Sequence, residues 1–237
     1  SYIFLRGQGI KITSLVTKIC NEKNTRIPTL TNFSDRENKI DDGFEGAIVL
    51  DPEPGIYLED PVSVLDYASL YPSSIIEKNL SHETFICTQE DIDKNPEKYE
   101  WLKDIPHYII SYDDYNYEMK GKTVHKIKAD TITTCYFAKP NGVNGIIPTI
   151  LHTLLDERRN TRKKIKQTDD EDKKKVLDGL QLAYKVTANS VYGQMGAKTS
   201  GICFKKIAAC TTSIGRQRIY DAKEGVKEWA EAENYHP

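Results

Sequence analysis

The nine residues KVTANSVYG, at positions 185–193, decide how the rest of this chain is interpreted. If they form a helix, Lys185, Asn189 and Tyr192 stand at i, i+4 and i+7 and share one face. That face carries a cation, an amide and a phenol, whereas a helix that only covered a core would carry apolar side chains there. The apolar residues of the stretch fall mostly off that face. The pattern therefore predicts a helix that offers polar groups to a phosphate-bearing ligand.

A second long helix is predicted immediately upstream. Residues 148–167 begin with a proline, which the first turn of a helix tolerates because its N–H has no partner there. The acidic run TDDED (168–172) interrupts the pattern, and a further helix starts near Lys173 and continues through Tyr192. Two long helices joined by a short polar link predict an antiparallel helical hairpin.

The first helix of this hairpin carries Arg159 and Lys163 at i and i+4, so both point the same way. If the hairpin closes, they face Lys185 and Asn189, and three cations and an amide converge on one volume. Such a cluster suits a triphosphate. A solvated basic face is the alternative, and we assign it the remaining cations: Arg158, Arg162, Lys164, Lys166 and residues 173–175.

A carboxylate is expected near the same site. The residues VSVLD (62–66) predict a buried strand that ends in Asp66, and a helix is predicted over 71–80. A carboxylate beside a helix N-terminus that attracts phosphate supplies the hard oxygen ligands that Mg²⁺ requires. The alternative is that Asp66 caps the helix. Tyr71, on the same turn, either packs under the sugar of a nucleotide or is an ordinary half-buried tyrosine, and Tyr192 leaves the same two options.

The remaining chain gives coarser expectations. We predict a helix within 1–30, a loop over 31–45, a strand at 46–50, a turn at 51–55, an exposed elaboration over 88–120, a strand over 123–137, a turn at 141–145, and a strand at 202–210 that leads into a helix over 211–232.

Composition bounds the class of protein. The 237 residues are 38% hydrophobic with a formal net charge of −2, enough for a core in one or two domains. Five scattered cysteines without a CxxC pair indicate free thiols in a reducing compartment. No apolar run is long enough to span a bilayer, and the absence of GxxxxGK[ST] and GxGxxG disfavours P-loop and Rossmann enzymes. The five histidines show no metal-ligand spacing, and the opening residues SYIFLRGQ indicate a fragment.

Several of these sequence motifs resemble those of family B DNA polymerases of the alpha/delta-like branch. The overall resemblance suggests an enzyme of a large eukaryotic DNA virus. DYASLYPSSI (66–75) resembles motif A and KVTANSVYGQMGA (185–197) resembles motif B. DERRNTRKK (156–164), between them, looks like the family's basic fingers-helix motif. FEGAIVLDPEPG (44–55) is similar to the segment that joins exonuclease and polymerase regions, with Phe44 in place of tyrosine, and LRGQGIK (5–11) looks like the end of the exonuclease domain.

The resemblance implies a role for each matching residue. Asp66 would be the catalytic carboxylate and, with the backbone carbonyl of Tyr67, would bind Mg²⁺, two ions being held in the complete enzyme. The other implied contacts are with the dNTP and the new base pair. The dNTP would be contacted by Ser69, Leu70 and Tyr71, and Tyr71 would also be the gate that excludes a ribose 2′-OH. The triphosphate would be bound by Arg159, Lys163, Lys185 and Asn189, and the nascent base pair would be lined by Tyr192 and Gly193.

The resemblance also implies a fold and its division. We expect an α+β fold that combines part of a polymerase palm, a β-sheet with flanking helices, with an antiparallel two-helix fingers hairpin. Residues 1–45 would end the exonuclease domain, 46–147 begin the palm, 148–195 form the fingers and 196–237 return to the palm. Motif C (YGDTDS), which supplies the second metal-binding aspartate, is absent from the sequence. Because two carboxylates are needed to hold two metals, the chain alone is expected to be inactive.

The implied activity is template-directed DNA synthesis, in which a primer 3′-OH attacks the α-phosphate of a dNTP. Primer–template DNA and dNTPs would be its partners, with a sliding clamp or processivity factor bound through other regions and no membrane. The implied location is intracellular, in a host nucleus or a cytoplasmic viral factory. A different class of function remains open at this point: the basic hairpin is a non-catalytic nucleic-acid-binding module, for which Asp66 has no role.

Overall fold

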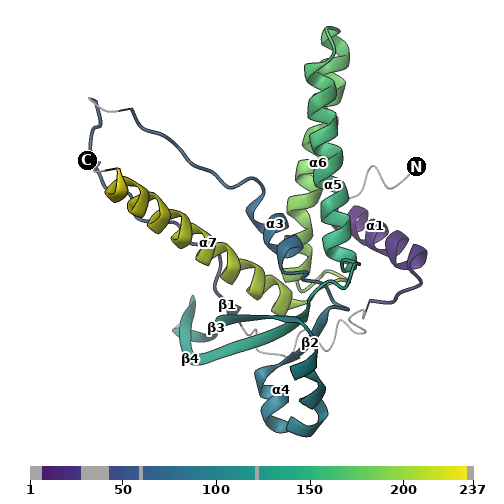
Figure 1. Ribbon diagram of the computed structural model, residues 1–237, viewed down its shortest axis with the longest axis vertical. Helices are drawn as coiled ribbons and strands as arrows, with labels where there is room; N and C mark the ends of the chain where they lie inside the picture. The colour runs from purple at the N-terminus through teal and green to yellow at the C-terminus, as the bar shows by residue number, and fades with distance from the viewer. Residues whose placement is uncertain (1–6, 28–42, 59–60, 121–122, 234–237) are drawn as a thin grey trace.

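The computed structural model describes residues 7–27, 43–58, 61–120 and 123–233. Its fold is α+β, as expected: an antiparallel sheet lies under a group of helices (Figure 1). The strand order in the sheet is β1-β3-β4-β2. The strands are β1 (Gly43–Phe44), β2 (Phe85–Thr88), β3 (His107–Lys120) and β4 (Thr123–Ala138). The helices are α1 (Gln8–Glu22), α3 (Leu70–Glu77), α4 (Gln89–Lys94), the 3₁₀ helix η2 (Pro96–Asp104), α5 (Ile146–Lys166), α6 (Glu171–Gly196) and α7 (Lys205–Ala232).

The helical hairpin predicted from the sequence is confirmed. Helices α5 and α6 pack along each other and project away from the sheet (Figure 1). The acidic break is also the start of α6, because the Asp170 carboxylate accepts the N–H groups of Asp172 and Lys173 at 3.0 and 3.1 Å. A carboxylate at an N-cap satisfies donors that the helix itself cannot, and it matches the positive end of the helix dipole. The hairpin therefore begins and ends close to the predicted residues.

The hydrophobic core lies where the hairpin meets the rest of the molecule. It takes side chains from α1, α3, the first turns of α5, the last turns of α6, the first half of α7 and the inner face of β3 and β4. Ile12, Phe137, Ile147, Met195 and Ile207 are all fully buried there. Cys20, Cys87, Cys135 and Cys210 are free thiols, as expected. The outer part of the hairpin contributes almost nothing to this core, so its position depends on how its base is held.

The predicted exposed elaboration over 88–120 is only partly correct. Its first half is a small appendage, α4 and η2, which begins with a capping box between Thr88 and Asp91. Its second half is β3, which pairs with β4 along nearly its whole length and so belongs to the main sheet. The strand expected over 123–137 is confirmed as β4. Weak periodicity in β3 misled the sequence interpretation, because tyrosines occupy both faces of the strand.

Three expected strands are wrong. Residues 46–50 and 62–66 are extended chain without strand pairing among the described residues, and Val64 and Leu65 are 88% and 75% exposed. The run 202–210 holds no strand either, because α7 begins at Lys205 and its apolar residues are buried at helical spacing. A short apolar run fits a strand and a buried helix equally well. A strand also needs a neighbour to accept its hydrogen bonds, and 62–66 has none in the described chain.

The predictions for the N-terminal part of the chain are tested only in part. The helix predicted within 1–30 is α1, and most of the predicted loop over 31–45 lies outside the described residues. No described helix has both the length and the apolar character that crossing a membrane would require.

Candidate functional site

The start of α3 is a sharp corner in the chain. Ser69, the residue before the helix, has φ 57° and ψ 58°. This is the left-handed region, which costs free energy for a residue with a Cβ and is often found at functional sites. The Ser69 side chain does not cap the helix. The N–H groups of Leu70 and Tyr71 therefore have no acceptor within α3, and these are among the residues expected to contact a triphosphate.

Two tyrosines from distant parts of the sequence meet at this corner. The ring centroids of Tyr71 on α3 and Tyr192 on α6 lie 4.6 Å apart, with a 44° angle between the planes. Burial raises the pKa of both phenols, while the charge of Arg216 acts in the opposite direction. Both therefore remain neutral hydroxyls at physiological pH. The contact joins the stretch around Asp66 to the stretch that carries Lys185.

A glycine on α7 makes room for the first of these rings. A Cβ placed on Gly215 would lie 2.8 Å from Cε1 of Tyr71, closer than real Cβ contacts. Only glycine lets the backbone of α7 approach the ring so closely. Sequence reasoning missed Gly215, because a single glycine inside a helical pattern gives no sign of what packs against it.

Arg216, the next residue on α7, was also missed. Its side chain is only 11% exposed, and its Nε lies 3.2 Å from a carboxylate oxygen of Glu45. Its Nη1 donates to the backbone carbonyls of Glu45 and Gly46 at 3.0 and 2.9 Å. Arg216 thereby ties the chain that follows β1 to α7 and places a half-buried cation near Tyr71 and Tyr192.

Asp66 and Tyr67 lie at the end of the extended segment. The Tyr67 hydroxyl donates to the carbonyl of Arg218 on α7 at 2.9 Å, which fixes this end of the segment. Asp66 is exposed. Among the described residues, nothing forms a hydrogen bond or an ion pair with its carboxylate, so both oxygens are open to a ligand.

The predicted cationic residues stand on the accessible surface of the hairpin. Lys163, Lys185 and Asn189 are exposed, and Arg159 donates to Asp156 on its own helix at 3.0 Å. Arg158 instead reaches across the hairpin, where its Nε donates to Gln181 on α6 at 3.2 Å. Arg158, assigned above to a solvated face, is therefore directed towards α6.

The glycines after Tyr192 differ from each other. A Cβ on Gly193 would meet nothing within 4 Å, so this position is open to a flat ligand. A Cβ on Gly196 would lie 3.6 Å from that of Ala208, so Gly196 borders on α7.

Comparison with known proteins decides the family. A model of DNA polymerase family B matches residues 1–236. The chain belongs to DNA polymerase family B. It is 42% identical to the DNA polymerase of Pyramimonas orientalis virus over 94% of this chain and 21% of that protein. It is 34% identical to the DNA polymerase delta catalytic subunit of Candida albicans over 100% of this chain and 20% of that protein. The resemblance to viral and delta-like enzymes is confirmed.

The family B fold is also found among solved structures. The family B DNA polymerase of the archaeon Pyrobaculum calidifontis matches 96% of this chain and 25% of its own, with a TM-score of 0.58 and 23% identity. At that identity the likeness shows the fold alone. The chain spans about a fifth of the length of the curated relatives named above.

Family B polymerases are generally metal-dependent, which raises the question of whether the residues near Asp66 fit Mg²⁺. In the described parts of the chain, no three His, Cys, Asp or Glu side chains are grouped to hold a metal ion. Mg²⁺ is commonly bound by one or two carboxylates together with phosphate oxygens and water. The open carboxylate of Asp66 and the adjacent carbonyl of Tyr67 fit one part of such a site.

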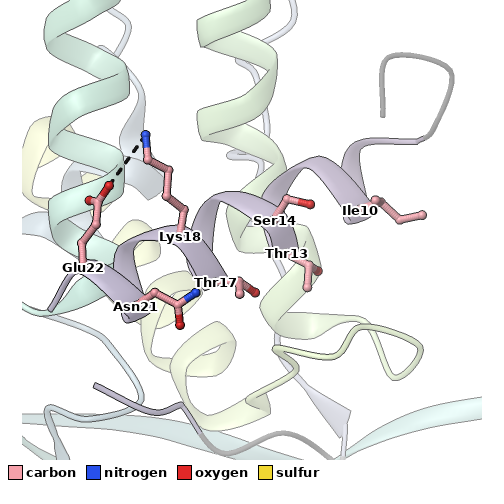
Figure 2. A pocket seen from close by; sticks show the side chains of 7 residues that line it. All are labelled: Ile10, Thr13, Ser14, Thr17, Lys18, Asn21 and Glu22. Carbon is pink, nitrogen blue, oxygen red and sulfur yellow. Dashed lines mark ion pairs between the residues drawn. The ribbon is translucent and has the colours of Figure 1, made fainter. Parts of the chain in front are cut away.

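A hollow on the outer face of α1 lies apart from the residues predicted to bind nucleotide and Mg²⁺. Figure 2 shows its lining, which includes Thr13, Ser14 and Thr17 and is bordered by the Lys18–Glu22 ion pair at 3.8 Å. None of the residues predicted to bind nucleotide in this family B chain lines it.

Proposed function

We propose that this chain is the part of a longer family B polymerase that binds the incoming dNTP and supplies one of its two catalytic carboxylates. The reaction is the attack of a primer 3′-OH on the α-phosphate of a dNTP, with release of pyrophosphate. The contact between Tyr71 and Tyr192 carries the proposal. It joins the turn that follows Asp66 to the helix that carries Lys185, two stretches that are separate in the sequence and that a nucleotide must touch together.

The roles proposed for the residues follow their positions. Ser69 and the open N–H groups of Leu70 and Tyr71 bind phosphate oxygens, because unpaired donors at a helix start attract anions. Tyr71 excludes a ribose 2′-OH by its ring, which Gly215 and Tyr192 keep in place.

The hairpin supplies the counter-charge. Arg159, Lys163, Lys185 and Asn189 approach the triphosphate from the exposed face of α5 and α6, while Tyr192 and Gly193 border the nascent base pair. Positioning and charge neutralisation of this kind are what phosphoryl transfer requires of a protein.

Asp66 and the carbonyl of Tyr67 would hold Mg²⁺ in the complete enzyme. When bound, such ions would supply Lewis-acid chemistry, activating the primer 3′-OH and stabilising the leaving pyrophosphate. Asp66 acts in this scheme by keeping its carboxylate open, at the end of a segment that Tyr67 anchors to α7. With one such carboxylate, the 237-residue chain by itself does not extend a primer.

The division of the chain follows from the same proposal. Residues 1–45 end an exonuclease domain, 46–147 and 196–237 belong to the palm, and 148–195 are the fingers. Primer–template DNA and dNTPs are the proposed partners.

Replacement of Asp66 by alanine in the complete polymerase tests the proposal. We expect the rate of primer extension at saturating dNTP to fall by about a thousandfold or more, because a metal ligand is lost. Affinity for primer–template is expected to stay within about twofold of the parent, since DNA backbone binding rests on cations. Extension is measured by single-turnover kinetics and DNA affinity by fluorescence anisotropy.

Asp51→Ala is the matched control, since Asp51 is another exposed carboxylate in the same extended segment. It should extend primers at the parent's rate. Unchanged extension by Asp66→Ala would contradict the proposal. Mg²⁺-independent DNA binding by the hairpin, without incorporation by the parent, would support a non-catalytic binding module instead.

A further inference from the structure

The first turn of α5 is closed by residues from outside the helix. Gly145, its N-cap, has no side chain to accept the free N–H groups. A Cβ on Gly145 would lie 2.8 Å from the Cβ of Ser81 and 2.9 Å from Cγ2 of Thr84. A self-capping serine or asparagine therefore does not fit at position 145.

The missing acceptors come from residues 79–84 (NLSHET), which we call the capping loop. The Gly145 N–H donates to Oδ1 of Asn79 at 2.8 Å, and the Ile146 N–H donates to Oε1 of Glu83. The Ile147 N–H donates to Oγ of Ser81 at 3.2 Å. The next residue is a proline, which has no N–H. Every free donor at the start of α5 is thus satisfied by side chains of one loop, so this helix end needs no water or ligand to complete it.

The capping loop is itself held rigidly. Ser81 Oγ donates to Oε2 of Glu83 at 2.7 Å, which orients the carboxylate towards α5. Thr84 Oγ1 donates to the carbonyl of Asn79, closing the loop on itself. Asn79 adopts φ 51°, a left-handed conformation that asparagine tolerates better than most residues. It is 2% exposed, and its amide also donates to Ala138 at the end of β4.

The same loop reaches the other end of the hairpin. Nε2 of His82 lies 3.0 Å from the carbonyl of Ile202, in the turn between α6 and α7, and its ring packs on Phe204. Burial lowers the pKa of His82, so it binds there as a neutral imidazole. One loop therefore contacts both places where the hairpin joins the molecule.

We infer that the capping loop sets the position of the α5–α6 hairpin relative to α3, and that Glu83 is its principal positioning residue. The inference rests on the proposed function, in which the hairpin brings cations to a triphosphate. Glu83 touches no part of the nucleotide site and acts through the Ile146 N–H. When the loop is intact, the hairpin occupies the arrangement that binds dNTP. When the cap is lost, that arrangement is populated less, and the apparent dNTP affinity falls by the same factor.

Glu83→Ala in the complete polymerase tests this role. We expect KM for dNTP to rise by about fivefold to tenfold, as the loss of a helix cap implies, with kcat and primer–template affinity unchanged. A role limited to stability would reduce the amount of active enzyme without moving KM. Glu83→Gln keeps an acceptor oxygen for Ile146, and amides cap helices about as well as carboxylates, so it should restore KM to within about twofold of the parent.

Glu90→Ala is the matched control. Glu90 is an exposed glutamate nearby on α4 that pairs with Lys94 of the same helix, and its loss should leave KM unchanged. An unchanged KM in Glu83→Ala, a fall in kcat at constant KM, or an equal change in Glu90→Ala would each overturn the inference.

Amide hydrogen exchange separates this inference from the proposed function. In the complete polymerase, Glu83→Ala should lower the protection of the Ile146 amide by about tenfold, with little change at Ile75 in α3. Unchanged protection would overturn the inference even if the enzyme polymerises. If the parent polymerase incorporates no nucleotide, the proposed function fails, while the exchange experiment still decides whether Glu83 caps α5.

Discussion

The base of the α5–α6 hairpin and the extended residues 45–58 and 61–67 are both in contact with the core helices, yet they are stabilised in opposite ways. At the base, Ile147 is fully buried and every free donor of α5 has an acceptor. In the extended segment, Val49, Leu58 and Val64 are 88%, 87% and 88% exposed. A helix closes its hydrogen bonds within itself, whereas an extended chain needs a neighbour. The helical region is therefore buried and hydrogen-bonded among the described residues, whereas the extended region is mostly exposed.

Alanine substitutions at the two regions test this contrast most directly. Ile147→Ala should lower the free energy of unfolding by about 2–5 kcal/mol, because it leaves a cavity in a packed core. Val64→Ala should change it by less than about 0.5 kcal/mol, because the side chain is already in water. Urea unfolding of both variants, followed by circular dichroism, gives the comparison. A loss above about 1 kcal/mol for Val64→Ala would mean that the segment is packed against something.

A pair of glycines on α7 extends the contrast between packed and open positions. Gly215→Ala should destabilise the protein by about 1–3 kcal/mol, since its Cβ would overlap the ring of Tyr71. Gly225 lies on the same helix, and a Cβ there would meet nothing within 4 Å. Gly225→Ala should therefore stabilise by about 0.5–1 kcal/mol through helix propensity. Thermal unfolding measures both, and equal shifts would show that Tyr71 does not pack on Gly215.

The smallest expected effect is a dependence of stability on alkaline pH. The folded-state pKa of Tyr71 is raised by burial, so the unfolded chain releases this proton first as pH rises. The resulting stability is present below about pH 10, the ordinary tyrosine pKa, and is lost as pH rises through the folded value. The free energy of unfolding should therefore fall less between about pH 8 and about pH 10.5 in Tyr71→Phe than in the parent. Identical slopes would place the Tyr71 hydroxyl in water.

The helices could be predicted from the sequence because their signals are local. Pro148, the acidic run 168–172 and the spacing of Lys185, Asn189 and Tyr192 all report on the chain near them. Lys185 and Asn189 are exposed and Ala188 and Val191 are buried, but Val186, an apolar residue off the predicted polar face, is 40% exposed.

The remaining features depend on partners that are distant in the sequence. An arginine in a polar helix shows no sign that it will bind the carbonyls of Glu45 and Gly46, as Arg216 does. Residues 62–66 have the composition of a buried strand, and composition does not reveal whether a pairing strand is present. The acceptors for α5 lie more than sixty residues upstream, so NLSHET carries no capping signature that can be read locally.

Because α5 is long, a small change in its orientation at the N-terminus, here called its root, produces a large displacement of its C-terminal end. Its 21 residues form an arm of roughly 32 Å at 1.5 Å per residue. A tilt of about 5° at the root of such an arm sweeps the tip through about 3 Å, the length of one hydrogen bond. Small adjustments among the few polar atoms that cap the root are thus amplified into larger displacements along the arm.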